Sequence, residues 1–213
     1  MYLSRMILNP DNREVMRGFA RPSVFHGAIE TATHRGSGRN LWRIDAFQKG
    51  YCLLILTTEA PDLTSMQGQF GFPGQSPLTK EYDHFLQKIE QGQQWQFRIK
   101  INPVVNHLGD RIPVKNCDLN EWFIEKAEKN GFSVNESAFS LIELRDYSFT
   151  KNNIKEAVQF KTATFNGTLV ISDKEKILLA LQNGIGHEKA FGCGLLTLAR
   201  INEERIVERD LQC

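Results

Sequence analysis

The sequence of 213 residues contains no long apolar segment. No stretch reaches the ~18 consecutive apolar residues that a membrane span needs. The first residues, Met-Tyr-Leu-Ser-Arg, do not begin the long apolar core of a secretion signal. We therefore expect a cytoplasmic protein that has no membrane partner.

Cysteine is scarce, and an excess of either charge is missing. The four cysteines are scattered, with no C-x-x-C pair and no histidine at metal-ligand spacing, which argues against a zinc site and a disulfide framework. The 26 Lys and Arg residues nearly balance the 25 Asp and Glu residues, for a net charge of +1. Such a balance argues against indiscriminate binding of polyanions, yet it permits a local basic groove.

The first half of the chain alternates strands and helices in a recognisable order. The pattern predicts strand, helix, strand, strand, helix and strand at residues 1–8, 23–34, 41–46, 51–58, 81–90 and 94–103. In the last of these strands, apolar residues such as Trp95 and Phe97 alternate with polar ones. This β-α-β-β-α-β order is that of ferredoxin-like and RRM-like folds.

The second half repeats this order less clearly. It shows a helix at 120–131, strands at 138–144 and 158–165, and a helix at 174–183 before a last strand at 195–201. Asn166-Gly167 predicts a hairpin turn into a strand at 168–172, and the first strand is expected near 112–115. Asp173 is expected to cap the second helix, and Gly184 to end it.

These patterns predict an α+β protein with two tandem ferredoxin-like (RRM-like) βαββαβ domains. The expected parts are an N-terminal domain, a linker, a C-terminal domain and a charged tail, at residues 1–103, 104–118, 119–201 and 202–213.

One histidine lies on the polar side of the first predicted helix. The apolar stripe of this helix is centred between Phe25 and Ala28, and His26 falls well away from it, on the side of Ser23 and Glu30. Imidazole titrates near neutral pH and is suited to general acid or base catalysis. Periodicity alone equally allows an ordinary surface histidine. The sequence has no G-x-S-x-G motif that would indicate a serine hydrolase.

A glycine-rich stretch, NGIGHEKAFGCGLLTLA at residues 183–199, follows the last predicted helix. Dinucleotide and P-loop motifs follow a strand and open a helix, whereas this stretch follows a helix and opens a strand. We therefore expect no NAD or ATP cofactor. Gly184 and Gly186, and likewise Gly192 and Gly194, let the backbone pass close to a neighbour, which is either a packed element or a nucleic-acid backbone.

The stretch fits the pattern G-[IV]-G-x-x-K-[AS]-x-G-x-G-L-L-[ST]-[LV]. In this it resembles the glycine-rich loop of the CRISPR repeat-processing endoribonucleases, most closely the CasE subunits of type I-E Cascade complexes. The resemblance extends to Ile201 through M-Y-L-S at the start, Leu8-Asn9-Pro10, the histidine on the first helix, F-R-I-K-I-N-P at 97–103 and F-N-G-T-L-V-I at 165–171.

This resemblance implies two tandem ferredoxin-like domains and an enzyme that cleaves precursor CRISPR RNA at the base of each repeat hairpin. It implies cleavage without a metal, 2′,3′-cyclic phosphate and 5′-OH ends, retention of the cleaved hairpin, and other Cascade subunits as partners. His26 matches the catalytic histidine of the family. The alternatives are a non-catalytic RNA-hairpin-binding subunit of Cascade and an unrelated ferredoxin-like protein that binds a small molecule.

Ser23 departs from the family, because some relatives carry a tyrosine one helical turn before the histidine. A serine hydroxyl is too weak an acid to transfer a proton unaided, so it is expected either to hydrogen-bond phosphate or ribose, or to cap the helix. Lys161, Lys155 and Tyr147 are candidates for a second proton-transfer group. The alternative is that His26 and electrostatic strain suffice.

RNA contacts are expected from cations in several parts of the chain, since A-form RNA is gripped by its shape and phosphates. Lys151 and Lys155 occupy the place of the family's basic RNA-contacting hairpin. The other expected RNA-binding residues are Arg98, Lys100, Arg111, Lys115, Lys161, Lys189 and, in the glycine-rich stretch, Gly184 and Gly186.

Overall fold

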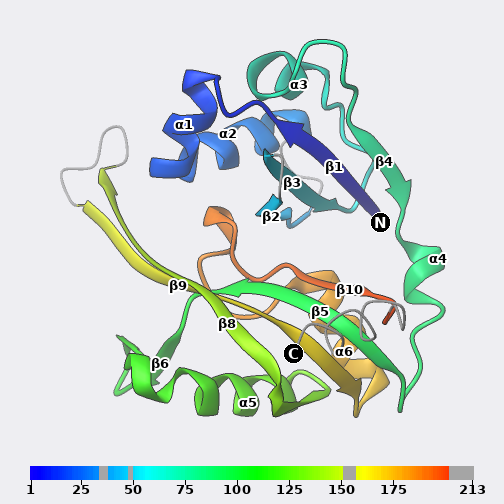
Figure 1. Ribbon diagram of the computed structural model, residues 1–213, viewed down its shortest axis with the longest axis vertical. Helices are drawn as coiled ribbons and strands as arrows, with labels where there is room; N and C mark the ends of the chain where they lie inside the picture. Colours follow the sequence, from blue (N-terminus) through cyan, green and yellow to red (C-terminus); the bar gives the residue numbers. More distant parts are fainter. Residues whose placement is uncertain (34–37, 48–49, 151–156, 202–213) are drawn as a thin grey trace, which may run out of the picture.

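The computed structural model describes residues 1–33, 38–47, 50–150 and 157–201, and it is built around two four-stranded antiparallel sheets (Figure 1). The strand orders are β2-β3-β1-β4 and β10-β5-β9-β8. In each sheet, the first strand of the unit lies between the third and the fourth, as in a ferredoxin-like fold. The prediction of two tandem ferredoxin-like units is therefore confirmed.

The first sheet carries its helices on one face and buries an apolar core beneath them. Its strands are β1 (Tyr2–Leu8), β2 (Leu41–Phe47), β3 (Gly50–Thr57) and β4 (Leu78–Glu81). Its helices are α1 (Arg13–Ala20), α2 (Ser23–Ala32) and α3 (Thr64–Phe70), and the short α4 (Asp83–Leu86) follows β4. Phe25 and Ile29 of α2 are fully buried against Leu53 and Ile55 of β3 in one apolar cluster.

The second sheet is built around long strands. Its strands are β5 (Gln94–Ile101), β8 (Phe132–Thr150), β9 (Ala157–Ile171) and β10 (Leu196–Ala199). Helices α5 (Leu119–Lys129) and α6 (Lys174–Asn183) accompany it, and the remaining elements are β6 (Val104–His107), β7 (Asp110–Pro113) and the 3-10 turns η1 (Asn116–Asp118) and η2 (Lys189–Phe191). In its core, the rings of Phe123 and Phe165 stack with centroids 4.2 Å apart.

Two strand assignments made from the sequence were wrong. Strand β5 does not complete the first sheet, because it pairs with β9 and β10 and is the first strand of the second unit. The place expected for that first strand, 112–115, overlaps β7 at residues 112 and 113, and within the described residues β7 pairs with β6 alone. The true fourth strand of the first sheet, β4, has four residues that are all exposed, so it carries no apolar pattern that could reveal it.

The change of sheet between β4 and β5 argues for a boundary within residues 82–93 rather than at 103. The division into folding units at 1–103, 104–118 and 119–201 stays a prediction. The tail, 202–213, lies outside the described residues.

The hairpin turn predicted at Asn166-Gly167 was also wrong, because β9 runs straight through both residues. Gly167 lies opposite a bulge in β8, where the register shifts between Val134 and Phe139. A side chain at Gly167 would collide with the Ala138 carbonyl oxygen and with Phe139, so close approach of two backbones, and not a turn, accounts for this glycine.

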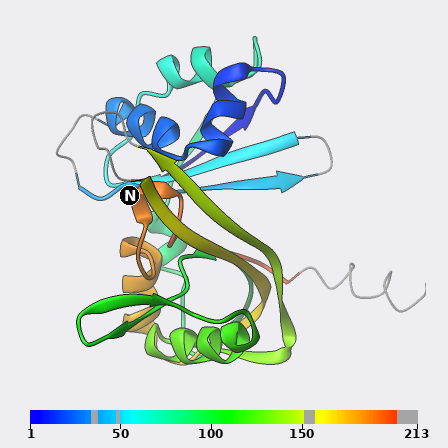
Figure 2. The same cartoon turned by 90° about the vertical axis from the view of Figure 1, so that its left-hand side faces the viewer.

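The true hairpin of this unit joins β8 to β9 and extends from the second sheet toward α1 and α2 (Figures 1 and 2). Its outer half is tied to the end of α1 by Arg145, whose Nη2 donates a hydrogen bond to the Phe19 carbonyl oxygen at 3.0 Å. The predicted limits of α6 hold: the Asp173 carboxylate accepts a hydrogen bond from the Lys176 N–H at 3.1 Å, and Gly184 ends the helix at φ 70°. Among the helices that the structure describes, none combines the length and apolar character of a membrane span.

Candidate active site

His26 lies on the outer face of α2, as the helical periodicity predicts. Phe25 and Ile29 of the same helix are fully buried, whereas the His26 side chain is 38% exposed. Pro22 occupies the N-cap position, and its carbonyl oxygen accepts the His26 N–H at 3.1 Å. The backbone of the first turn therefore fixes the base of the side chain while the ring remains accessible to a substrate.

Ser23 does not cap α2. It is the first residue of the helix and is half-buried, and Pro22 takes the cap position. Of the two roles expected for this serine, capping is thus wrong. A hydrogen bond from its hydroxyl to RNA stays a prediction.

A carboxylate faces one nitrogen of the His26 ring. The Glu30 Oε1 atom lies 3.9 Å from His26 Nδ1, one helical turn further along α2. The same oxygen accepts a hydrogen bond from Asn40 Nδ2 at 3.0 Å, and this amide group also donates to Thr33 Oγ1 at 2.8 Å. Since Nδ1 faces Glu30, Nε2 is the ring atom available for proton transfer to or from a substrate.

The glycine-rich stretch meets α2 at Phe191. The Phe191 ring stands edge-on to the His26 ring, with centroids 6.5 Å apart. On the hairpin side it stacks on Phe160 at 5.3 Å and meets Phe149 edge-on at 5.4 Å. One aromatic cluster thus joins α2, the glycine-rich stretch and the β8–β9 hairpin next to the histidine.

The glycines of this stretch serve close packing between the two sheets. A side chain at Gly192 would meet Trp42 Cζ3 at 2.9 Å, and one at Gly184 would meet Leu41 Cδ2 at 2.8 Å. Both contacts are to β2 of the first sheet. The Gly194 N–H donates to the Lys100 carbonyl oxygen at 2.7 Å in the second sheet. Of the two neighbours expected from the sequence, packed elements are therefore present, and the predicted RNA contact of Gly184 and Gly186 stays untested.

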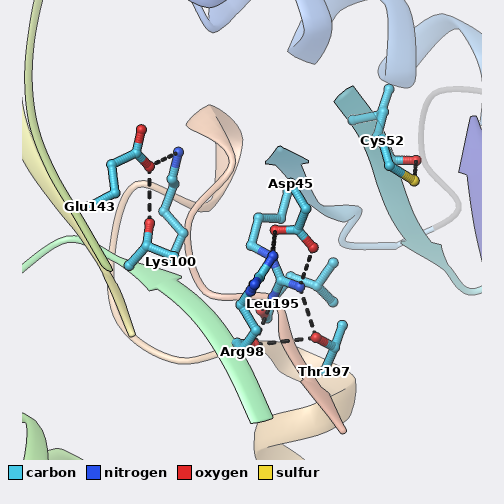
Figure 3. Close-up of polar contacts among 10 residues, drawn as sticks. Asp45, Cys52, Arg98, Lys100, Glu143, Leu195 and Thr197 are labelled. Carbon is cyan, nitrogen blue, oxygen red and sulfur yellow. Dashed lines mark hydrogen bonds and ion pairs between the residues drawn. The ribbon is translucent and has the colours of Figure 1, made fainter. Parts of the chain in front are cut away.

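A cleft of about 420 Å³, here called the intersheet cleft, opens between the two sheets beside Phe191. Its walls include Phe19, Trp42, Asp45, Tyr51, Arg98, Lys100, Glu143, Arg145, Tyr147, Thr164 and Phe191. Two ion pairs line it: Arg98 Nη1 lies 3.8 Å from Asp45 Oδ1, and Lys100 Nζ lies 3.1 Å from Glu143 Oε2 (Figure 3).

Lys100 holds Glu143 in its ionised form. Burial would raise the pKa of the Glu143 carboxyl, but the charge and hydrogen bond of Lys100 and the hydrogen bond of Thr164 outweigh it, so the pKa lies below its usual range. At neutral pH, Glu143 is therefore a carboxylate that can only accept hydrogen bonds.

Sequence reasoning missed the residue that joins the sheets most directly. Arg43 of β2 is only 1% exposed, and its guanidinium binds both oxygens of Asp45, at 2.7 and 2.8 Å. Its Nη1 donates to the carbonyl oxygens of Arg98 and Leu195, each at 2.7 Å, and its Nη2 donates to Thr197 Oγ1 at 2.8 Å. The available signal was an arginine and an aspartate two residues apart, hence on one face, in a strand that is otherwise largely apolar.

The predicted RNA-binding cations differ in accessibility. Lys100 is 9% exposed and paired, so its role as a surface contact is not supported, whereas Arg111 and Lys115 are exposed. Arg111 Nη1 lies 3.8 Å from Glu188, and Lys161 Nζ donates to Asn116 Oδ1 at 2.9 Å.

Lys189 is turned toward the protein, because its Nζ donates to the Asn183 carbonyl oxygen at 2.7 Å. Burial and the nearby charge of Arg39 lower the pKa of Lys189. Lys151 and Lys155 lie outside the described residues. Tyr147 lies in the cleft wall, where its ring stacks on Phe160 at 5.0 Å.

Comparison with known proteins places this geometry in a family. A family model described as "CRISPR associated protein" matches residues 1–200. The CRISPR-associated endoribonuclease Cse3 of Thermus thermophilus is 27% identical over an alignment of 218 positions, which covers 93% of this chain and all of that protein. The structure of Thermus thermophilus Cse3 bound to an RNA representing a pre-cleavage complex superimposes with a TM-score of 0.75 at 26% identity, covering 93% of this chain and 98% of the other.

A more distant relative shares the fold alone. The crystal structure of Cas6e from Escherichia coli K-12 superimposes with a TM-score of 0.57 at 20% identity, over 94% of this chain and all of the other. Since the family match runs from residue 1 to residue 200 of the 213, and full-length relatives align over nearly the whole chain, this protein belongs to the family of CRISPR-associated proteins.

Proposed function

We propose that this protein is an endoribonuclease that cleaves precursor CRISPR RNA at the base of the repeat hairpin and remains bound to the product. The observation that carries the proposal is the accessible His26 ring beside the glycine-rich stretch, in a chain of which 93% aligns with a CRISPR-associated endoribonuclease. A structure of Thermus thermophilus Cse3 is known in which it is bound to an RNA representing a pre-cleavage complex. The protein then acts in the cytoplasm together with other Cascade subunits.

The proposed reaction needs two proton transfers and no metal. The ribose 2′-oxygen attacks the adjacent phosphorus while its proton passes to a base, and the bond from phosphorus to the 5′-oxygen breaks as that oxygen receives a proton. The products are a 2′,3′-cyclic phosphate and a 5′-OH. His26 Nε2 performs one of these transfers, because Nδ1 faces Glu30.

The second transfer has no assigned group in this proposal. The Lys161 amine is engaged by Asn116, and the Tyr147 phenol belongs to the wall of the intersheet cleft. The Ser23 hydroxyl shares the first turn of α2 with His26 and is proposed to hydrogen-bond the ribose-phosphate. The exposed Arg111 and Lys115, and the less accessible Arg98, Lys161 and Lys189, are proposed RNA contacts together with Lys151 and Lys155.

Replacement of the histidine tests the proposal. In His26→Ala, single-turnover cleavage of the repeat RNA is expected to fall at least about 100-fold, the lower range for loss of an acid–base group, with the RNA Kd nearly unchanged. His84→Ala is the matched control, because His84 is 76% exposed and lies beside Glu81, away from α2. The assay contains a chelator, and mass spectrometry identifies the product ends. Full activity of His26→Ala, or loss of wild-type activity in chelator, contradicts the mechanism.

A second candidate, a non-catalytic subunit that only holds the RNA hairpin, is favoured by one observation: Ser23 stands where some relatives carry a tyrosine. An intact repeat RNA after long incubation with wild-type protein, at concentrations where binding is complete, supports this candidate. If the protein shows no salt-dependent affinity for the RNA, both RNA-based candidates fail.

A further inference from the structure

The intersheet cleft has the size of a small-ligand site and adjoins the histidine. Its volume of about 420 Å³ lies within the ~300–1,000 Å³ typical of such sites, which is far too small for an RNA duplex. Phe191 lines the cleft and also contacts the His26 ring, so a single aromatic side chain separates the cleft from the proposed catalytic group.

The charges in the cleft do not favour a phosphate. Arg98 and Lys100 each lie against a carboxylate, Asp45 at 3.8 Å and Glu143 at 3.1 Å (Figure 3). Arg145, the remaining cation of the wall, donates to the Phe19 carbonyl oxygen. A phosphate placed here would meet two carboxylates together with cations that already have partners. An uncharged group therefore fits better than an anion.

Planar groups supply surfaces on which a flat ligand can stack. The exposed Arg145 guanidinium lies over one face of the Tyr147 ring, 4.7 Å from its centroid, and Phe160 stacks on the other face, so a flat ligand can stack on the guanidinium but not on that ring. The rings of Phe19 and Tyr51, with centroids 4.5 Å apart and planes tilted by 55°, also line the cleft. Unstacked RNA bases are commonly held on aromatic rings and on guanidinium planes. An uncharged planar heterocycle from RNA is a nucleobase.

Glu143 gives the cleft a preference among bases. Its Oε2 accepts hydrogen bonds from Lys100 and from Thr164 Oγ1, each at 3.1 Å, and the side chain remains 43% exposed. Within the part of the chain that the structure describes, no hydrogen bond to its Oε1 is found, so this oxygen can accept one more. Adenine, cytosine and guanine each carry an exocyclic amino group that can donate to it. Uracil has no amino group, and its one ring donor, N3–H, lies between two carbonyl oxygens that a carboxylate repels.

We propose that the intersheet cleft holds one unstacked base of the RNA strand next to the scissile linkage, and that Glu143 selects a base with an exocyclic amino group. This inference rests on the proposed RNA-processing function and adds a base-selective subsite to it. The preference acts at a single nucleotide, in contrast to the sequence-independent grip of a duplex by phosphate contacts.

Single-turnover cleavage of a panel of repeat RNAs tests the inference. Each nucleotide on either side of the cleavage site is replaced in turn by each of the four bases. At one position, uracil is expected to slow wild-type cleavage about tenfold or more relative to the best amino-bearing base. Glu143→Gln is expected to lose most of this preference, since an amide that also donates can pair with uracil.

Two further variants keep the test decisive. Glu136→Gln is the matched control, because Glu136 is an exposed carboxylate on the same strand, outside the cleft wall. Ala46→Trp places a large ring in the cleft from β2 of the first sheet, whereas Lys100 and Glu143 belong to the second sheet, and it is expected to abolish the preference even if Glu143→Gln unfolds.

Failure of this inference and failure of the proposed function give different results. Equal cleavage of all RNAs in the panel by the wild type overturns the subsite and leaves the nuclease intact. If the wild type cleaves none of them, the proposed nuclease fails. In that case the subsite is tested by the fluorescence of 2-aminopurine placed at each candidate position of the RNA. A fluorescence change on binding that is lost in Ala46→Trp supports the subsite. The absence of any such change at every position refutes it.

Discussion

At the scale of single residues, the chemistry of this protein depends on side chains that lie just off a buried stripe. His26 follows the fully buried Phe25 on α2 and precedes Ile29 by three positions. The same helix brings Glu30 to the Nδ1 side of the ring, and Asn40, the residue before β2, donates a hydrogen bond to the Glu30 carboxylate. The histidine is thus oriented by groups whose positions the helix and its neighbouring strand fix.

Removal of the Glu30 charge tests this orientation. In Glu30→Gln, the cleavage rate of bound RNA is expected to fall about two- to fivefold, equivalent to the ~0.5–1 kcal/mol of a partly exposed ion pair, with no change in RNA Kd. Glu125→Gln is the control, because Glu125 forms a similar i,i+4 pair with Lys129 at 3.4 Å on α5. A weaker Kd with an unchanged rate constant would assign Glu30 to binding instead.

At the scale of elements, the glycine-rich stretch acts as a packed wedge between the sheets. Gly192 has φ 83° and lies against the Trp42 ring, and the adjacent Phe191 contacts His26 on one side and the β8–β9 hairpin on the other. A shift of this stretch therefore displaces the aromatic cluster next to the proposed catalytic group.

A comparison of two glycines distinguishes the effect of this packing on stability from the effect of the backbone conformation. Gly192 and Gly92 both have φ 83°, but a side chain at Gly92 would meet open space. Gly92→Ala is expected to destabilise the protein by ~1–2 kcal/mol through the left-handed conformation alone. Gly192→Ala is expected to cost more than Gly92→Ala in urea unfolding and also to slow cleavage, because Trp42 and Phe191 must move. Equal losses of stability would show that the Trp42 contact adds nothing.

At the scale of the whole molecule, one buried arginine holds the two sheets together. Arg43 extends from β2 and donates hydrogen bonds to Arg98 of β5, to Thr197 of β10 and to Leu195, the residue before β10, while Asp45 balances its charge. The bonds fix the distance between the walls of the intersheet cleft. The relative position of the sheets is therefore built into hydrogen bonds as well as apolar contact.

Loss of Arg43 is expected to destabilise the whole chain. Arg43→Met removes the donors and leaves Asp45 without its main partner, a change that typically costs ~3–5 kcal/mol for a buried pair. Arg17→Met is the control, because Arg17 is 52% exposed and lies 3.5 Å from Glu14 on the surface of α1. Urea unfolding measures both. A loss of less than ~0.5 kcal/mol in Arg43→Met would contradict a structural role for the buried hydrogen bonds.

Local patterns predicted a large part of this molecule. The position of His26 outside the buried stripe follows from a period of 3.6 residues, and the limits of α6 follow from Asp173 and Gly184. The position of the glycine-rich stretch between a helix and a strand was also predicted from the sequence, and this position argued against a dinucleotide cofactor. These features depend on neighbours in the sequence, which is why the sequence alone determined them.

Only the tertiary structure decided which sheet each strand joins and which residues meet across the sheets. Apolar and polar residues alternate along β5 as they would in a strand of either sheet. Its pairing with β9 and β10, which lie far along the chain, decides that it belongs to the second sheet. The exposed β4 carries no apolar pattern, and the partners that Arg43 contacts across the sheets lie 55 to 154 residues away. Hydrogen bonds between distant segments produce no periodic pattern in the sequence, so the intersheet cleft could be identified only from the tertiary structure.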